Sequence, residues 1–451
     1  MFTFWRPGAA PKRCKYNKQQ KYLEKEINKA VDIAMTANHS SDWEEADDAR
    51  DRAFQTNKPI IALGKPGTGK TTVVKECIRR SQDAGAKVLR TEARVLLGLP
   101  TAQLASRMRT ALQSFAGVEI ETCHAAFKLE QPIQESLPIM TMYDLIVIDE
   151  ISLLDMPQFE RLIKLWNVAQ KVPALVLLGD KYQLPGVGKT RAWESKAWPK
   201  PHCKHIQLIH AWRCKEKKFQ RILDELRVSK PRKKTLRQMC AGHKAWGKGK
   251  PKPSDLAKLL AAHPDTQIVT CTRKGAADVN KAAIEAIYKR KAPLAWVPGD
   301  VEGNPENFGR DGQFRTDRAP LPCFVPIYKK MKMFLTKNVR KDDDYVNGMQ
   351  CTVEQYYASN NSIRVMTKTG HRLMITPWSD KEKQNANYFT IRPGYASTIH
   401  KVQGDEFKHI TIWLDMKGMP AAGYTALSRV ATSSCYLLGG EVTRDHFTPA
   451  M

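Results

Sequence analysis

The sequence predicts an α/β protein built on parallel sheets, with a strand-rich module inserted in a second α/β unit. From Pro59 onward, short apolar segments alternate with amphipathic ones, as in sheets that are covered by helices. The candidate strands end in polar turns, which is where open parallel sheets bind ligands. The chain has 451 residues, enough for two or three domains with separate cores.

The predicted elements are placed in chain order. Residues 1–58 are polar and highly charged, and a helix is expected over about 18–37. Strands of the first sheet are expected at 59–63, 93–98, 145–148 and 174–178. A strand at 266–270 opens the second α/β pattern, which the strand-rich segment 320–390 interrupts. Within that segment strands are expected at 331–335, 350–356 and 362–366, and the α/β alternation resumes near Tyr388.

Two segments have the residue types that handle nucleotide phosphates. Residues 64–71 fit G-x-x-x-x-G-K-[ST], a glycine loop whose backbone N–H groups wrap a β-phosphate. Lys70 would reach the β- and γ-oxygens. The apolar strand 145–148 ends at Asp149 and Glu150, which predicts a metal ligand followed by an acid beside the attacking water. The sequence therefore predicts hydrolysis of a nucleoside triphosphate.

The residues expected around this nucleotide follow from the same two segments. The metal ligands for Mg²⁺ are predicted to be Thr71 and Asp149. The phosphate-loop residues expected to bind the nucleotide are Gly64, Pro66, Gly67, Thr68, Gly69, Lys70, Thr71 and Thr72.

The charge of the chain predicts a polyanionic partner. Lys and Arg number 73 against 46 acidic residues, a net charge of +27, which favours nucleic acid or an anionic membrane surface. No apolar run reaches the length of a membrane-spanning helix. Ten cysteines without a CxxC pair indicate reduced thiols, so we expect a soluble intracellular protein of the nucleus or cytoplasm. Residues 1–23 hold six basic and no acidic side chains, which leaves organelle targeting or a nucleic-acid-binding arm open.

Two further segments have alternative interpretations. Cys203, His205, His210 and Cys214 could bind zinc, but their spacing matches no familiar zinc framework, and a strand through this segment is favoured. Residues 227–253 contain ten Lys or Arg and no acid. This stretch is either a solvated linker or helix face, or a patch that follows a nucleic-acid backbone.

Several ordered segments resemble superfamily 1 helicases of the RecD and Pif type, which move 5′ to 3′. The resemblance covers about residues 59–440, and its most specific parts are Ser-Thr-Ile-His-Lys-Val-Gln-Gly at 397–404 and Tyr-Thr-Ala-Leu-Ser-Arg at 424–429. The other matching segments are Pro-Thr-Ala at 100–102, Thr-Cys-His at 122–124, Asp-Glu-Ile-Ser at 149–152, Gly-Asp-Lys-Tyr-Gln-Leu-Pro at 179–185, Trp-Arg at 212–213, and Asn338 with Tyr-Val-Asn-Gly at 345–348.

The resemblance implies two RecA-like parallel-sheet domains, with a small β-rich (SH3-like) insertion in the second. The implied limits are a basic N-terminal extension at 1–58, the first RecA-like domain at 59–205, the second at 206–319 and 391–451, and the insertion at 320–390. ATP would bind between the two domains. The implied catalytic residues are Lys70, Asp149, Glu150, Gln183, Arg213 and Arg429, with Gln403 and Gly404 also at the nucleotide.

The same resemblance implies single-stranded and duplex DNA as partners. The implied strand contacts are Thr101, Thr122, His124, Asn347, Thr398, His400 and Lys401. An RNA helicase stays open as an alternative, as does a strand-stimulated ATPase clamp that does not translocate. The glutamine upstream of the phosphate loop, which reads adenine in this family, has no clear counterpart, because Gln55 lies too near the loop. The segment between His124 and Asp149 is short, so any strand-separating wedge in it is expected to be small.

Overall fold

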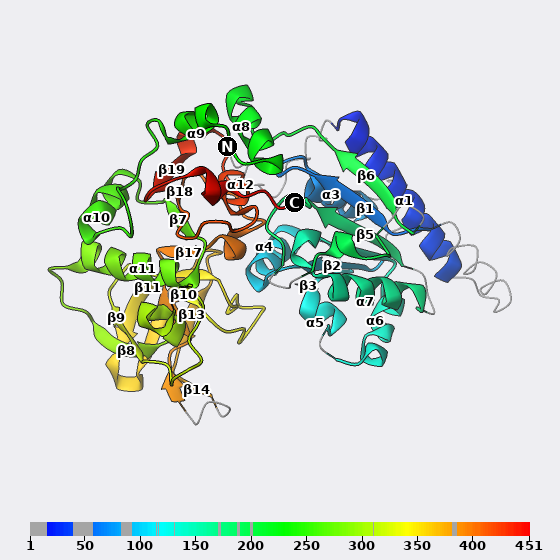
Figure 1. Ribbon diagram of the computed structural model, residues 1–451. Coiled ribbons are helices and arrows are strands. Elements are labelled where there is room, and N and C mark those ends of the chain that lie inside the picture. The colour runs from blue at the N-terminus through cyan, green and yellow to red at the C-terminus, as the bar shows by residue number, and fades with distance from the viewer. Residues whose placement is uncertain are drawn as a thin grey trace.

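The computed structural model describes residues 16–38, 57–82, 93–113, 115, 117–129, 131–169, 173–186, 190–198, 202–309, 311–380 and 386–451. Two α/β domains lie side by side, and a β-rich insertion adjoins the second (Figure 1). No described helix has the length and apolar character that crossing a bilayer requires.

The first domain is built on a six-stranded parallel sheet in the order β3-β2-β4-β5-β1-β6. Its strands are β1 (Ile60–Gly64), β2 (Val95–Leu99), β3 (Val118–Thr122), β4 (Leu145–Ile148), β5 (Ala174–Gly179) and β6 (Lys204–Leu208). Its helices are α3 (Lys70–Gln82), α4 (Ala102–Leu112), α5 (Cys123–Phe127), α6 (Leu137–Met142) and α7 (Met156–Asn167). The four predicted strands are present within two residues of their expected ends. The expected limit at 205/206 falls inside β6, which pairs with β1, so the first domain extends to Leu208.

The predicted N-terminal helix forms as α1 (Lys18–Asn38) and is part of the first domain. Leu23, Ile27 and Val31 are spaced four residues apart, so they share one face of the helix, and all three are fully buried. They pack in one core with Ile60 of β1 and Val73 of α3. The first domain therefore begins well before the expected limit at residue 59.

The second domain has a four-stranded parallel sheet in the order β17-β7-β18-β19. Its strands are β7 (Gln267–Thr270), β17 (Ala396–Thr398), β18 (Ile410–Trp413) and β19 (Tyr436–Gly439). Its helices are α8 (Lys217–Val228), α9 (Lys233–Cys240), α10 (Pro253–Ala262), α11 (Arg273–Tyr288) and α12 (Ala422–Leu427). With the first sheet, this confirms the fold class of two RecA-like domains.

The insertion is a five-stranded antiparallel sheet in the order β13-β12-β11-β10-β16, with two hairpins. The sheet strands are β10 (Lys332–Leu335), β11 (Gln350–Tyr357), β12 (Ser362–Thr367), β13 (Arg372–Ile375) and β16 (Ile391–Pro393). The hairpins pair β8 (Ala295–Gly299) with β9 (Cys323–Ile327) and β14 (Trp378–Asp380) with β15 (Ala386–Tyr388). Because β8 and β16 lie outside 320–390 and share a core with the other strands, the β-rich part is longer than expected on both sides.

Candidate nucleotide and strand sites

The phosphate loop connects β1 to α3 and has the backbone that its glycines predict. Gly67 and Gly69 have φ of 76° and 81°, in the left-handed region that favours glycine. A Cβ on Gly67 would lie 2.4 Å from the Cβ of Arg213, so a side chain at this position would clash with Arg213. The buried Lys70 donates from Nζ to the carbonyls of Gly64 at 2.7 Å and Lys65 at 3.2 Å.

The charge of Lys70 is held in a buried setting. Burial lowers the pKa of this ammonium group, while the carboxylates of Asp180, Glu150 and Asp149 oppose that shift. The loop thus holds the buried ammonium group of Lys70 where it could exchange its hydrogen bonds to backbone carbonyls for hydrogen bonds to phosphate oxygens.

The acid pair follows the central strand β4, and its first member faces α3. The Thr71 hydroxyl donates to Asp149 Oδ2 at 2.7 Å, so the two predicted metal ligands lie side by side. Glu150 has φ of 55°, which is uncommon for a non-glycine residue and occurs often at functional sites. Burial raises the pKa of Glu150, as does Asp149, while Arg429 and Lys70 oppose the shift.

Two predicted residues from the second domain reach this acid pair. The Gln403 side-chain amide donates to Glu150 Oε2 at 3.2 Å and to Ser152 Oγ at 2.9 Å. Gly404 has φ of 84°, and a Cβ there would lie 2.9 Å from Leu104, so the glycine permits close approach to the first domain. Gln403 thereby ties Glu150 to the loop that carries the predicted strand contacts.

Arg429 follows α12 in the second domain and reaches Gln183 of the first domain. It is 1% exposed, and its guanidinium donates to Gln183 Oε1 at 2.7 Å and to the Thr425 carbonyl at 2.9 Å. Burial lowers the pKa of Arg429 to about 10, with Arg213 adding to the shift, so the group stays charged at neutral pH. A planar fork that holds two partners in fixed directions requires arginine rather than lysine.

Arg213 lies between the phosphate loop and the segment that precedes Arg429. Its guanidinium donates to the Ser428 carbonyl at 3.1 Å and pairs with Glu406 at 3.0 Å. The backbone N–H of Trp212 donates to the Gly67 carbonyl at 2.8 Å, which fixes this segment against the loop. A neighbouring cavity of about 160 Å³ is lined by Pro66 and Arg213 among others. The contacts of Arg429 with Gln183, and the electrostatic effects among Lys70, Asp149, Glu150, Arg213 and Arg429, bring the six predicted catalytic residues together where the two domains meet.

The remaining predicted phosphate-loop residues differ in their surroundings. Thr68 is buried, and its hydroxyl donates to the Lys65 carbonyl at 2.9 Å, so it shapes the loop. Thr72, in the first turn of α3, has an exposed side chain.

Gln20 is a site residue that the sequence interpretation missed. Its side-chain amide donates to the Thr68 carbonyl at 3.2 Å, and the side chain is 3% exposed. Gln20 and Asn17 also cap the start of α1 reciprocally, at 3.1 and 2.9 Å. This pattern of a capping residue followed three positions later by glutamine, ahead of an apolar run, was readable in the sequence. Gln20 thus contacts the phosphate loop from upstream in the chain, whereas Gln55 lies outside the described residues.

Asp180 links the loop after β5 to the second domain through a buried ion pair. It is fully buried and accepts from the Arg227 guanidinium at 2.8 Å and from the Tyr424 hydroxyl at 2.9 Å. Arg227 also lies over the Tyr182 ring, 4.0 Å from its centroid. Because Gln183 lies on the same loop, these contacts hold it toward Arg429.

Replacing Arg227 by alanine is expected to lower the free energy of unfolding by about 3 kcal/mol, because Asp180 would stay buried without its charged partner. Chemical denaturation would measure the change, with Arg221→Ala as the control because Arg221 is exposed on the same helix. Arg227→Ala should also weaken nucleotide turnover, since the Gln183 loop loses its anchor. Wild-type stability in Arg227→Ala would contradict a role for the pair in joining the domains.

The first-domain residues predicted to contact a strand lie at the starts of two helices. Thr101 caps α4 by accepting from the Leu104 N–H at 3.2 Å, and Thr122 caps α5 by accepting from the Ala125 N–H at 3.3 Å. Each hydroxyl therefore has a structural role and keeps its own O–H to donate. His124 is exposed, with Nε2 3.3 Å from the Gln158 amide.

The second-domain strand residues lie on β17 and the short helix η8 (Ile399–Val402). Thr398 is partly buried, and burial lowers the pKa of His400, while a hydrogen bond with the Pro185 backbone opposes the shift. Burial lowers the pKa of Lys401 to about 7, with Arg392 the next cause. Asn347 is exposed in the insertion, and its N–H donates to the Asn338 side chain at 2.8 Å.

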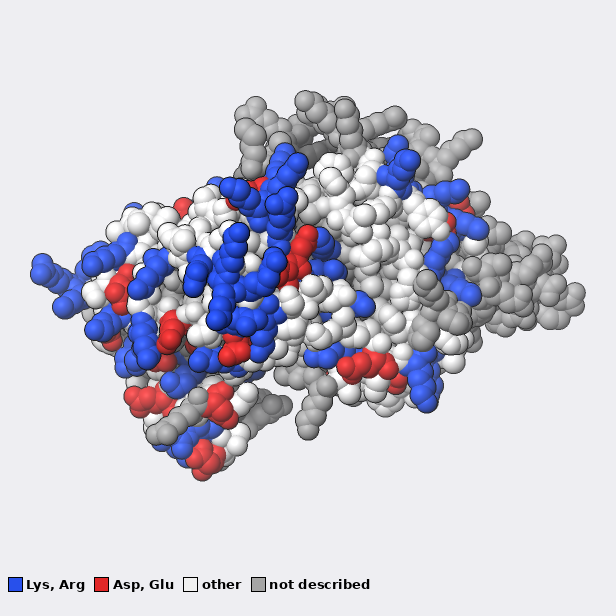
Figure 2. All heavy atoms as spheres, turned by 45° about the horizontal axis from the view of Figure 1, so that its top comes forward, with Lys and Arg blue, Asp and Glu red and all other residues white. Residues whose placement is uncertain are grey.

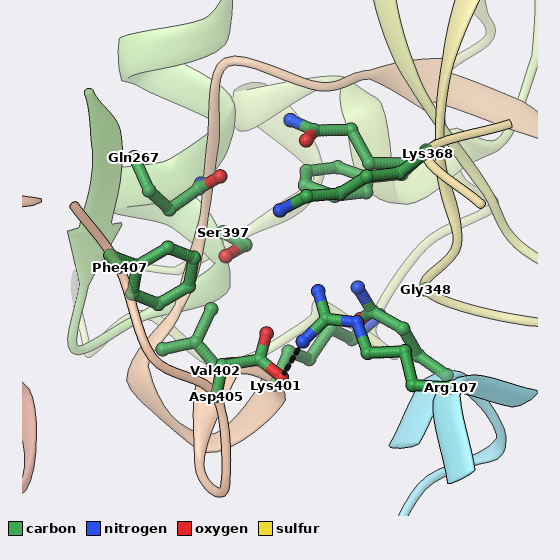
Figure 3. A pocket seen from close by; sticks show the side chains of 12 residues that line it. Arg107, Gln267, Gly348, Lys368, Ser397, Lys401, Val402, Asp405 and Phe407 are labelled. Carbon is green, nitrogen blue, oxygen red and sulfur yellow. Dashed lines mark hydrogen bonds and ion pairs between the residues drawn. The ribbon is translucent and has the colours of Figure 1, made fainter. Parts of the chain in front are cut away.

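A pocket where α4, η8 and the insertion meet is lined by one of the predicted strand contacts, Lys401 (Figure 3). Arg107 of α4 pairs with Asp405 of the second domain at 2.5 Å. Lys401 and Lys368, the latter from the insertion, also line this pocket. Three parts of the chain therefore converge beside the predicted strand path.

The segment with the four potential zinc ligands is organised by other contacts. His205 lies on β6, with Nε2 2.8 Å from the Trp198 carbonyl, and His210 packs edge-on against Trp212. Within the described ranges, no group of three or more Cys, His, Asp or Glu is placed to hold a metal ion. The strand interpretation fits this segment.

Comparisons with known proteins agree with the resemblance. A family model described as an AAA domain matches residues 48–189. The human ATP-dependent DNA helicase PIF1 is 23% identical over 413 residues, which cover 84% of this chain and 58% of that protein. The RecBCD enzyme subunit RecD of Haemophilus influenzae is 28% identical over 147 residues, which cover 28% of this chain and 22% of that protein. The chain thus spans little more than half the length of its PIF1 relative.

Solved structures show the same architecture. Bacteroides Pif1 bound to ssDNA matches with a TM-score of 0.63 and 17% identity, covering 96% of this chain and 94% of that one. Pif1 helicase from Candida albicans matches with a TM-score of 0.64 and 17% identity, covering 97% and 96%. The chain therefore shares the two-domain fold of these solved Pif1 structures, and the curated proteins it resembles include DNA helicase PIF1 and RecD.

Proposed function

We propose that the protein is an ATP-dependent DNA helicase that moves 5′ to 3′ along single-stranded DNA and unwinds duplex. The observation that carries this proposal is the contact between Arg429 of the second domain and Gln183 of the first, close to Glu150 of the acid pair. Catalytic groups from two domains meet there, so binding and loss of a nucleotide would change how the domains fit together. The human relative, which is named an ATP-dependent DNA helicase, supports DNA as the polymer.

The residues at the cleft fit a Mg²⁺-bound triphosphate. The hydroxyl of Thr71 and the carboxylate of Asp149 are adjacent oxygen ligands of the kind that Mg²⁺ prefers. The bound ion would neutralise charge on the β- and γ-phosphates. Gln20 contacts the loop from the side of α1, and we propose that it takes the place of the adenine-reading glutamine.

Hydrolysis would divide its tasks between the two domains. Glu150 would accept a proton from the attacking water, and Gln183 would orient that water. Arg213 and Arg429 would cross the cleft to stabilise charge on the transferring phosphoryl group. The present bonds of Arg429 to Gln183 and Thr425 hold its fork near these groups before a nucleotide arrives.

Strand movement would be coupled to this chemistry through the segment from β17 to Gly404. Thr398 and His400 are predicted strand contacts, and Gln403 donates to Glu150. Only two residues separate His400 from Gln403, and the short helix η8 spans most of that interval. A change in the position of Glu150 can therefore be transmitted through Gln403 and η8 to the proposed strand contacts. Thr101, Thr122, His124, Asn347 and Lys401 complete the proposed path, where polar groups would contact phosphates and position the strand.

Glu150→Gln should reduce turnover by about 10²–10⁴-fold while nucleotide and strand binding persist, because the amide keeps the side chain's shape and cannot accept the proton. Single-turnover hydrolysis and strand binding in the presence of ATP would measure the two properties separately. Glu160→Gln, on the exposed side of α7, is the matched control. Turnover equal to wild type in Glu150→Gln would remove Glu150 from the general-base role.

Translocation is tested by displacement of streptavidin from biotinylated single-stranded DNA. A 5′-to-3′ motor should clear the block from the 3′ end faster than from the 5′ end, and only with ATP. Glu150→Gln should clear neither. Strand-stimulated hydrolysis without displacement would favour the clamp, and equal or greater activity on RNA would favour an RNA helicase.

A further inference from the structure

A surface of basic side chains covers α8, α9 and the loop that leads to α10. We call it the α8–α9 basic surface. Figure 2 shows Lys and Arg side chains gathered in a band on the half of the molecule that carries these helices. Between Leu226 and Lys252 the chain contains no acidic residue. The exposed members are Lys217, Lys218, Arg221, Lys230, Arg232, Lys233, Lys234, Arg237, Lys244, Lys248, Lys250 and Lys252.

Most of this charge has no ion-pair partner among the residues that the structure describes. Four members pair with acids, since Lys230, Arg232, Lys248 and Lys250 contact Asp445, Glu225, Glu441 and Asp278. The other eight form no ion pair with any residue that the structure describes. Fixed unpaired cations of one sign on one face produce a local positive potential that attracts polyanions.

The surface is held in shape by packing beneath it. Trp246, in the loop after α9, is 3% exposed, and its indole N–H donates to the Gly249 carbonyl at 3.2 Å. Just before Trp246 the loop bonds to Leu438 of β19: the Ala245 N–H donates to the Leu438 carbonyl at 2.8 Å, and the Leu438 N–H donates to the His243 carbonyl at 2.6 Å. The lysines of this loop therefore extend from a fixed backbone, which suits a binding surface better than a linker.

The surface lies on elements that the proposed strand path does not use. The inner side of α8 faces the nucleotide cleft, where Asp224 pairs with Lys65 of the phosphate loop. The proposed strand contacts lie at the starts of α4 and α5, on β17 and η8, and in the insertion. A polymer on the α8–α9 basic surface would therefore be a second segment of nucleic acid.

We propose that the α8–α9 basic surface binds the backbone of duplex DNA, separately from the single strand in the motor. Proteins that hold single strands stack bases on exposed aromatic rings. The two Phe, Tyr or Trp residues between Lys217 and Lys252, Phe219 and Trp246, are both buried, so the surface offers charge without stacking. Duplex DNA has the higher density of phosphate charge, and it binds such surfaces by releasing counterions. This inference goes beyond the proposed motor, because it supplies a site that keeps flanking duplex near it.

The test measures affinity for a short blunt-ended duplex while saturating oligo-dT fills the strand path. The variant K233Q/K234Q/R237Q removes three unpaired cations of α9. Its duplex affinity should fall, and the slope of log affinity against log salt should decrease by about 0.9 for each lost contact. A second variant, K244Q/K252Q, removes two further cations of the unpaired set and should also lower duplex affinity. The control K289Q/R290Q/K291Q removes the same charge from exposed positions at the end of α11 and should leave duplex affinity unchanged.

Oligo-dT affinity and strand-stimulated ATP hydrolysis separate this inference from the proposed function. Both should stay at wild-type values in K233Q/K234Q/R237Q. Unchanged duplex affinity in that variant, an equal loss in the control, or a parallel loss of oligo-dT affinity would overturn the separate duplex site. Polyglutamate that displaced the duplex as well as unlabelled duplex does would assign the surface to an acidic protein instead. If single-stranded DNA did not stimulate ATP hydrolysis by the wild-type protein, the proposed motor function would be contradicted. The measured duplex affinities would still decide whether the duplex site exists.

Discussion

Replacing Arg429 by alanine is expected to reduce ATP turnover by about 10³–10⁵-fold, the range found when an arginine that stabilises phosphoryl transfer is removed. The guanidinium is buried and charged, and it holds Gln183 and the Thr425 carbonyl at once. Arg429→Lys should recover little of the activity, because an ammonium group keeps the charge but cannot hold both partners in a plane. Steady-state kinetics should show the loss in kcat, with a smaller change in KM.

The Arg429 variants need a control for folding, since Gln183 and Thr425 each lose a partner in a buried place. An unsatisfied buried polar group costs about 1–3 kcal/mol. Thermal unfolding and fluorescent-nucleotide binding would show whether the variant is folded and still binds. Gln183→Ala is the matched partner variant, and a double-mutant cycle should give strongly non-additive losses. Turnover near wild type in a folded Arg429→Ala would exclude the arginine from the reaction.

Lys70→Ala is expected to lower turnover by at least about 100-fold, comparable to removing one fixed donor from a transition state. Lys70 is the desolvated cation of the phosphate loop, and it presently bonds to the carbonyls of Gly64 and Lys65. Its loss should weaken nucleotide binding as well, because the two carbonyl oxygens would then repel the phosphate oxygens with no cation between them. Lys164→Ala, on an exposed position of α7, is the control. Appreciable turnover in Lys70→Ala would contradict the assignment of the site.

The buried strands were readable from the sequence because parallel strands covered on both faces are continuous apolar runs. β4 matches its predicted limits at both ends. β3 was missed because it lies at the edge of the sheet, where Glu119 and Glu121 interrupt the apolar pattern. The limit implied at 205/206 falls inside β6, because the motifs that carry the resemblance do not reveal which strand pairs with β1.

The nucleotide site was more predictable than the contacts that join the domains. Local motifs predict the positions of Lys70 and Asp149, because the residues of each motif determine the backbone conformation around it. The partners of Arg429 and the position of Gln20 depend on how α1 and the second sheet pack, which no local pattern encodes. Thr101 shows the reverse case, because a predicted strand contact also caps its own helix.

The proposed motor requires that single-stranded DNA stimulates the hydrolysis of ATP between the two domains. Steady-state ATPase activity should be measured without polymer and with single-stranded DNA, single-stranded RNA and blunt duplex, beside Lys70→Ala. We expect strong stimulation by single-stranded DNA, weaker stimulation by the other polymers, and a loss of at least about 100-fold in Lys70→Ala. Equal rates with and without single-stranded DNA would contradict the proposed motor.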